Sequence, residues 1–200
     1  MNDRIGQWVR IVIDWNAWMW LAAIYLALVL GSLFVMQILS ISVMQMKAPL
    51  AILALGGVSS LIIGRSSSAT GASAWLRSTP TLIYLLFIFV MSSKSFFGVR
   101  PFVNIDYFHP LEYAFLGVFF SWFWAPSLLR GEISSFSLKV LTSGVLFGVS
   151  DELHQWFVPG RTCSIVDLIL DFIGVSIGLG IVLLARRVHG FLKERFAQRD

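Results

Sequence analysis

The sequence predicts an all-α fold, a polytopic bundle of about six transmembrane helices. Hydrophobic residues make up 57 % of the 200-residue chain and charged residues 13 %, whereas about 25 % of the residues of a soluble domain are charged. The apolar residues also gather in segments of about 20 residues, the length that crosses a bilayer as a helix. This composition excludes a soluble enzyme, a disordered chain, a coiled coil and a secreted disulfide scaffold. The single cysteine, Cys163, has no intramolecular disulfide partner.

The first apolar segment, residues 17–46, contains no charged residue and predicts the first span. It is too long for a signal peptide and no small-residue cleavage site follows it, so we expect a retained helix. Its last residues, 37–46, are more polar and are expected along the membrane interface. Residues 1–16 interleave apolar and charged side chains, which is typical of an interfacial or cytoplasmic N-terminal segment.

The second apolar segment, residues 48–64, lies between Lys47 and Arg65. It is near the lower limit of about 17 residues for a span, and Gly56-Gly57 weaken it further. A full span and a re-entrant segment are therefore both open. The Ser- and Gly-rich residues 65–79 predict a loop, so residues 17–79 would contain two transmembrane segments and this loop.

Four more spans and a basic tail complete the chain; they are expected at residues 80–97, 110–129, 137–158 and 164–185, with the tail at 188–200. With six spans and both termini cytoplasmic, the outside regions hold only Lys47, Lys94, Arg100 and Arg161 of the fifteen Lys and Arg residues. Lys and Arg are retained on the cytoplasmic side, which favours this orientation. If residues 48–64 do not span, the N-terminus moves outside and the last four spans keep their orientation. The net charge of +4 thus indicates topology and contact with anionic lipid, and not nucleic-acid binding.

Six of the eleven acidic residues fall at or inside the ends of the last three spans, together with two histidines and a glutamine; the acidic residues are Asp106, Glu112, Asp151, Glu152, Asp167 and Asp171. An ionised carboxylate that faces lipid costs about 2.5–3.5 kcal/mol on insertion scales. Asp167 and Asp171 share one helix face, so we expect them to point into the bundle toward Arg161, His154 or His109. Asp151, Glu152, His154 and Gln155 are expected to form one broad polar face.

The loop between the last two spans places a cation beside a helix start. Pro159 ends one helix and Gly160 permits a tight reversal, while Thr162 or Ser164 can cap the next helix. Arg161 then lies near free backbone N–H groups and the positive end of the helix dipole, where an anion is favoured. A phosphate or carboxylate headgroup would fit this position.

These residues carry a family resemblance. The stretch Asp151-Glu152-Leu153-His154-Gln155-Trp156-Phe157-Val158-Pro159-Gly160-Arg161, followed by Ser164, Asp167 and Asp171, resembles the signature of the VanZ-like membrane proteins, and His109 to Gly117 matches an upstream element of that family. The resemblance covers residues 80–187 as a four-helix core. It implies a protein of the bacterial cell envelope, in the cytoplasmic (inner) membrane. The family takes its name from a protein of low-level teicoplanin resistance, and the resemblance implies no particular reaction or cofactor.

Three functional hypotheses follow. The first is a binding protein whose outer-leaflet pocket holds a lipid or lipid-linked headgroup through Arg161, Asp167, Asp171, His109, Glu112 and Gln155. The second is an intramembrane hydrolase or transferase with His154, Glu152 or Asp151 as catalytic candidates, and with His109, Glu112, Asp151 and His154 as candidate metal ligands. The third is an accessory subunit that contacts other membrane proteins. The alternative without chemistry is a buried network that pairs Arg161 with Asp167 or Asp171, and His109 with Glu112 or Asp151.

Overall fold

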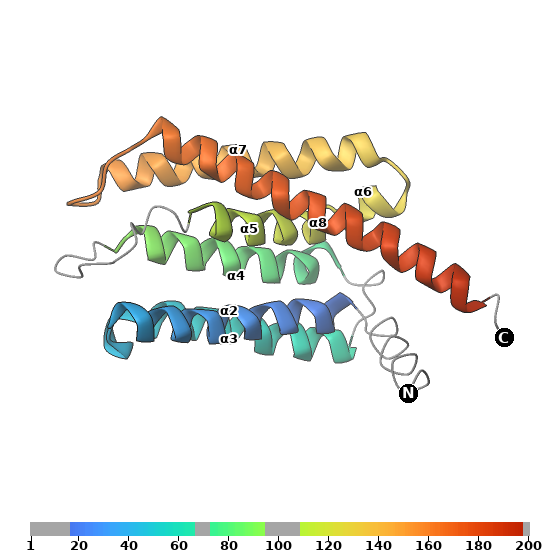
Figure 1. The fold of residues 1–200 in the computed structure, drawn as a ribbon, viewed down its shortest axis with the longest axis horizontal. Coiled ribbons are helices and arrows are strands. Elements are labelled where there is room, and N and C mark those ends of the chain that lie inside the picture. Colours follow the sequence, from blue (N-terminus) through green and yellow to red (C-terminus); the bar gives the residue numbers. More distant parts are fainter. Residues whose placement is uncertain (1–16, 67–72, 95–108, 198–200) are drawn as a thin grey trace.

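The computed structural model describes residues 17–66, 73–94 and 109–197, and this part of the chain consists of seven helices without a strand. The helices are α2 (Ala17–Leu39), α3 (Val43–Ser66), α4 (Ala74–Ser92), α5 (His109–Phe123), α6 (Ala125–Leu129), α7 (Ile133–Trp156) and α8 (Ile165–Ala197). The α2–α3 hairpin lies on one side, α4 and α5 lie in the middle, and α7 and α8 lie on the other side (Figure 1). The expected all-α fold is confirmed.

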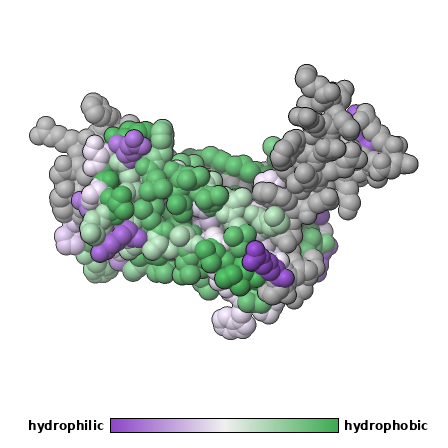
Figure 2. All heavy atoms as spheres, turned by 90° about the horizontal axis from the view of Figure 1, so that it is seen from below, coloured by the Kyte–Doolittle hydropathy of each residue, from purple (hydrophilic) through white to green (hydrophobic). Residues whose placement is uncertain are grey.

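Five of these helices are long and apolar enough to cross a membrane: α2, α3, α4, α7 and α8. Figure 2 shows the face on which α2 and α3 lie, where hydrophobic residues cover the middle and the visible hydrophilic residues lie toward the two ends. This is the surface of a helical bundle whose sides contact lipid and whose ends contact water. The chain is therefore a multi-pass membrane protein.

The expectation of six continuous spans is wrong for the fourth. Its residues form α5, of 15 residues, and the separate five-residue helix α6. The helix stops at Phe123 because Pro126 lacks a backbone N–H and its ring crowds the preceding turn. At about 1.5 Å per residue, α5 is about 22 Å long, shorter than the roughly 30 Å hydrocarbon core.

The second apolar segment is a full helix. α3 runs over Val43–Ser66 as one continuous helix, longer than the expected residues 48–64, and it is long and apolar enough to cross a membrane. Gly56 does not break it, because this glycine lets α2 approach: a Cβ atom there would lie 2.2 Å from the ring of Tyr25. A short turn at Ser40, with φ of 54°, joins α2 to α3, so the expected interfacial residues 37–46 form the end of α2, this turn and the start of α3.

Three other boundaries differ from the expected ones. Helix α4 begins at Ala74, inside the expected loop, because the side chain of Ser73 accepts a hydrogen bond from the Leu76 N–H. Helix α7 begins at Ile133 and ends at Trp156. Helix α8 has 33 residues, so the expected basic tail continues the last span as a helix. Residues 1–16 and 95–108, with Arg100 and Asp106, lie outside the described part.

Glycines set the distance between α5 and α8, which make the most extensive contact in the bundle. A Cβ atom at Gly178 would lie 2.0 Å from the Ala114 carbonyl oxygen, and one at Gly174 would lie 2.5 Å from the Pro110 carbonyl oxygen. From the other side, a Cβ atom at Gly117 would lie 2.5 Å from the Val175 carbonyl oxygen. The two backbones are thus in direct contact, as is typical of small residues spaced by four in membrane helices.

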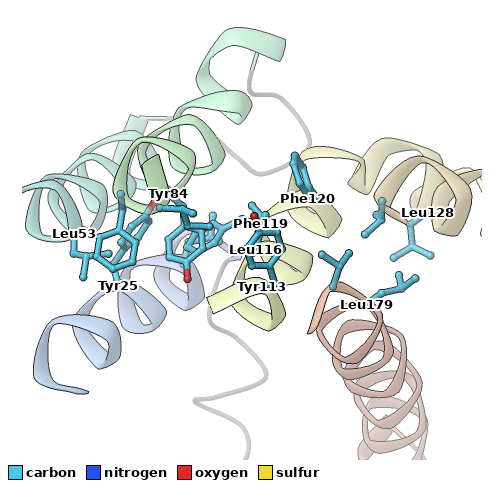
Figure 3. Packing of buried hydrophobic residues seen from close by; sticks show 14 of the residues in the cluster. Tyr25, Leu53, Tyr84, Tyr113, Leu116, Phe119, Phe120, Leu128 and Leu179 are labelled. Atoms are coloured by element: carbon cyan, nitrogen blue, oxygen red, sulfur yellow. The ribbon is translucent and has the colours of Figure 1, made fainter. Parts of the chain in front are cut away.

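Aromatic residues continue the core from α5 toward α2 (Figure 3). Phe119 stacks on Tyr84 with a centroid distance of 4.5 Å, and its ring also contacts that of Tyr25 at 4.9 Å. The Tyr84 hydroxyl donates to the carbonyl oxygen of Glu112 at 3.0 Å, and Thr81 donates to the carbonyl oxygen of Phe119 at 2.9 Å. These bonds fix α5 against α4 and thereby the position of its first turn, which carries His109 and Glu112.

Basic residues gather at one end of the bundle. The end at which the C-terminus lies (Figure 1) carries most of the described Lys and Arg side chains, namely Arg65, Arg77, Arg130, Lys139, Arg186, Arg187 and Arg195. Some of them fix this end: Arg186 donates to the Leu128 carbonyl oxygen at 2.9 Å and Lys139 donates to Ser127 Oγ at 2.8 Å. At the opposite end, the described Lys and Arg residues are only Lys47, Lys94 and Arg161.

Candidate functional site

A cavity of about 380 Å³ lies at the end of the bundle that carries the α7–α8 loop. It is enclosed by α2, the start of α3, α4, the start of α5 and Arg161 of the loop. Most of its wall is apolar, with Leu28, Val35, Phe87 and Phe115 among the lining residues. The polar side chains on the wall belong to Ser32, Tyr84, Ser92, His109, Glu112 and Arg161. The cavity is therefore apolar along its length and carries charged groups at the loop end.

His109 and Asp171 form a buried pair beside this cavity. His109 Nδ1 lies 3.4 Å from Asp171 Oδ1, and the two side chains are 8 % and 1 % exposed. The two atoms are close enough for an ion pair but are not aligned for a hydrogen bond. Gly148 on α7 makes room for this carboxylate, since a Cβ atom there would lie 3.3 Å from Asp171 Oδ2. The expected inward orientation of Asp171 is confirmed, with His109 as its partner.

Asp151 belongs to a second buried group that joins α7 to α5. Its Oδ2 atom accepts a hydrogen bond from Gln155 Nε2 at 2.9 Å and a longer one from the Tyr113 hydroxyl at 3.4 Å. Asp151 and Gln155 are buried, but neither lines the cavity. Both residues therefore belong to the packing of α7 against α5, and other side chains would contact a ligand in the cavity.

Glu152 fixes the loop that carries Arg161. The side chain is buried, and its Oε2 atom accepts a hydrogen bond from the Ser164 backbone N–H at 2.7 Å. Ser164 in turn caps α8, because its Oγ accepts from the N–H groups of Val166 and Asp167 at 3.2 and 3.4 Å. Gly160 takes the left-handed φ of 83° that the reversal requires. The expected reversal and cap are thus confirmed.

His154 does not join the other site residues. Its Nε2 atom lies 2.9 Å from Ser93 Oγ, and its ring lies 4.3 Å from that of Phe89, both at the end of α4. The expected polar face of α7 is therefore divided: Asp151, Glu152 and Gln155 are buried, while His154 is half-buried against α4 and does not line the cavity. In the described ranges, no three His, Cys, Asp or Glu side chains converge on a point where they could hold a metal ion.

The expected pairing of Arg161 with Asp167 or Asp171 is wrong, and so is that of His109 with Glu112 or Asp151. Apart from the masked ranges, the ion pairs are His109 with Asp171 and Arg130 with Glu132. Asp171 faces α5 rather than the loop, because Gly174 on the same face of α8 packs against Pro110. Arg161 lines the cavity, and its buried Nε atom has no hydrogen-bond partner among the described residues.

Four polar residues of the site were not found from the sequence. Tyr113 donates to Asp151, and Ser32, Tyr84 and Ser92 line the cavity. Tyr113 could have been predicted, because it lies one helical turn after His109 and therefore on the same helix face as a predicted site residue. For Ser92 the sequence contains no such signal.

A protein-family profile described as VanZ/LLP1 matches residues 20–186. The chain belongs to the VanZ/LLP1 family. The match includes the two N-terminal helices as well as residues 80–187, which carried the sequence resemblance. The curated proteins and the solved structures contain no match. In this VanZ/LLP1 protein, the family signature thus forms the buried groups of α7 and α8 and one charged side chain of the cavity.

Proposed function

We propose that this VanZ/LLP1 protein binds a phospholipid or a lipid-linked phosphate in the cavity beside the α7–α8 loop, in the outer leaflet of the bacterial cytoplasmic membrane. One observation carries the proposal: Arg161 lies at the polar end of an otherwise apolar cavity, and its buried Nε atom has no hydrogen-bond partner in the described part of the chain. A guanidinium is the side chain best suited to a phosphate, because its N–H groups can bind two oxygens at once.

The surroundings of Arg161 support a lipid rather than a water-soluble anion. Leu28, Val35, Phe87 and Phe115 give the cavity an apolar wall that an acyl chain could contact. Arg161 also precedes the start of α8, where backbone N–H groups and the helix dipole favour a negative charge. The cavity thus combines an anion-binding end with an apolar channel.

Neutralising Arg161 is expected to empty the cavity. Charge-assisted hydrogen bonds contribute about 1.5–3 kcal/mol, so Arg161→Gln should lower phospholipid occupancy about tenfold or more. The measurement is native mass spectrometry of the protein purified from nanodiscs that contain equal amounts of phosphatidylethanolamine and phosphatidylglycerol. The matched control is Arg187→Gln, an exposed arginine at the other end of the bundle. Equal occupancy in the two variants contradicts the proposal.

Cys163 offers a test of the proposed orientation. It is exposed in the α7–α8 loop and is the single cysteine of the chain. We expect a membrane-impermeant maleimide to label it from outside intact cells. Desolvation, and then the nearby Glu152 carboxylate, raise the pKa of this thiol, so less of it is thiolate at neutral pH and labelling should accelerate as the pH rises toward 9.

The control for this labelling carries Cys163→Ser together with Ser134→Cys, at an exposed position at the other end of α7. It should react only after the membrane is permeabilised. The reverse pattern, with position 134 labelled in intact cells and position 163 protected, contradicts an outer-leaflet cavity.

A hydrolase or transferase that acts on the same lipid is the second candidate. It is favoured by the His109–Asp171 pair, because His109 lines the cavity and a carboxylate behind the ring is the usual support of a general base. In this case His109→Gln abolishes turnover of the bound lipid while Arg161-dependent binding persists.

A further inference from the structure

The charged groups of the cavity have opposite signs. Arg161 brings a positive charge to the wall and Glu112 brings a negative one, whereas His109 on the same wall has Asp171 as its partner. Arg161 and Glu112 do not form an ion pair with each other, since the structure gives neither an opposite charge within 4 Å among the residues it describes. Among the described residues, Arg161 and Glu112 are thus a cation and a carboxyl group that both line the cavity without an ion-pair partner.

Glu112 is held in this position by its helix. It lies in the first turn of α5, and its backbone carbonyl oxygen accepts a hydrogen bond from the Tyr84 hydroxyl on α4. Its side chain lines the cavity. No described residue donates a hydrogen bond to its carboxylate. A carboxyl group without a partner inside a membrane protein is costly to ionise and marks a candidate functional site. The ligand that would compensate Glu112 must carry a positive charge or donate hydrogen bonds.

We infer that the cavity selects a zwitterionic amine phospholipid, whose phosphate is bound by Arg161 and whose ammonium group is bound by Glu112. This inference rests on the proposed function, since it assigns the headgroup class to the same cavity. A ligand with both charges satisfies both side chains at once. An anionic headgroup without an ammonium group satisfies Arg161 but offers Glu112 no positive charge, and it adds a like charge to the same cavity.

A second cavity in the structure shows what the charged end adds. It has about 430 Å³ and lies between α2 and α3, where its lining residues include Ala22, Leu26, Leu53 and Val58. Its wall carries no charged side chain. That cavity can accept an apolar chain, but it cannot distinguish one headgroup from another. Selection by headgroup thus requires the charged end of the first cavity, where Glu112 and Arg161 lie.

The test compares a zwitterionic amine lipid with an anionic lipid on the same full-length protein. In nanodiscs with equal amounts of phosphatidylethanolamine and phosphatidylglycerol, native mass spectrometry should show the ethanolamine lipid bound about tenfold more than the glycerol lipid. Glu112→Gln, which keeps the size of the side chain, should abolish this preference. Glu132→Gln, an exposed glutamate at the other end of the bundle, is the matched control and should leave the preference unchanged.

The outcomes separate this inference from the proposed function. If Arg161→Gln empties the cavity but the wild-type protein binds both lipids equally, or if Glu112→Gln keeps the tenfold preference, the headgroup assignment is overturned and the binding function stands. If Arg161→Gln leaves occupancy unchanged, the proposed function itself fails. Soluble glycerophosphoethanolamine, added in equal amount to the bound lipid, should not displace it; displacement overturns a membrane lipid as the source of the headgroup.

Discussion

Gly178→Ala is expected to destabilise the whole bundle, although it adds only one methyl group. The new Cβ atom would lie 2.0 Å from the carbonyl oxygen of Ala114, so α5 and α8 must move apart. Overpacking a well-packed contact costs about 1–3 kcal/mol, and a clash with backbone cannot be relieved by a rotamer change. We expect a loss at the upper end of this range, measured by unfolding of the purified protein in mild detergent.

The matched control is Gly180→Ala on the same helix. A Cβ atom at Gly180 meets no heavy atom within 4 Å, and alanine is the better helix former by about 1 kcal/mol. This variant should be as stable as the wild type or slightly more stable. If the two variants lose the same stability, the close approach of α5 and α8 does not hold the bundle together.

This contact also explains which part of the site could be predicted from the sequence. An ionised carboxylate that faces lipid is costly in free energy, so the inward orientation of Asp171 could be predicted. Its partner does not follow, because Arg161, His154 and His109 all lie at the same end of the predicted bundle. The choice depends on how α8 is rotated, and the approach of Gly174 and Gly178 to α5 places Asp171 against His109. The sequence contains the glycine spacing but does not name the helix on which it packs.

The prediction of the helix boundaries from hydropathy was limited, because local backbone effects also decide where a helix ends. Residues 110–129 form one apolar segment, and only the backbone consequence of Pro126 divides them into α5 and α6. The residues after Ala185 are basic, but Arg, Lys and Leu are good helix formers, so α8 continues beyond the predicted span. By contrast, the α7–α8 loop was predictable because Pro159, Gly160 and Ser164 each have a local backbone role.

Breaking the His109–Asp171 pair is expected to have the other large effect. Asp171→Asn leaves the His109 ring opposite a neutral amide in a nearly water-free site, since the Asp171 side chain is 1 % exposed. Removing one partner of a buried ion pair typically costs about 3–5 kcal/mol, because the other charge stays buried without compensation. The control is Asp167→Asn, one turn earlier on the same helix, half-buried and without an ion pair among the described residues. It should cost well under 1 kcal/mol.

A double-mutant cycle shows whether the pair, and not the aspartate alone, carries this cost. His109→Gln removes the ring, so adding Asp171→Asn to that background strands no charge and should cost much less than in the wild type. We expect a coupling free energy of about 1–3 kcal/mol between the two positions, measured by the same unfolding assay. Additive costs would mean that Asp171 is stabilised by its surroundings on α7 rather than by His109. In that case the pair could not act as a unit on a lipid in the cavity either, because the carboxylate would neither orient the ring nor stabilise its charged form.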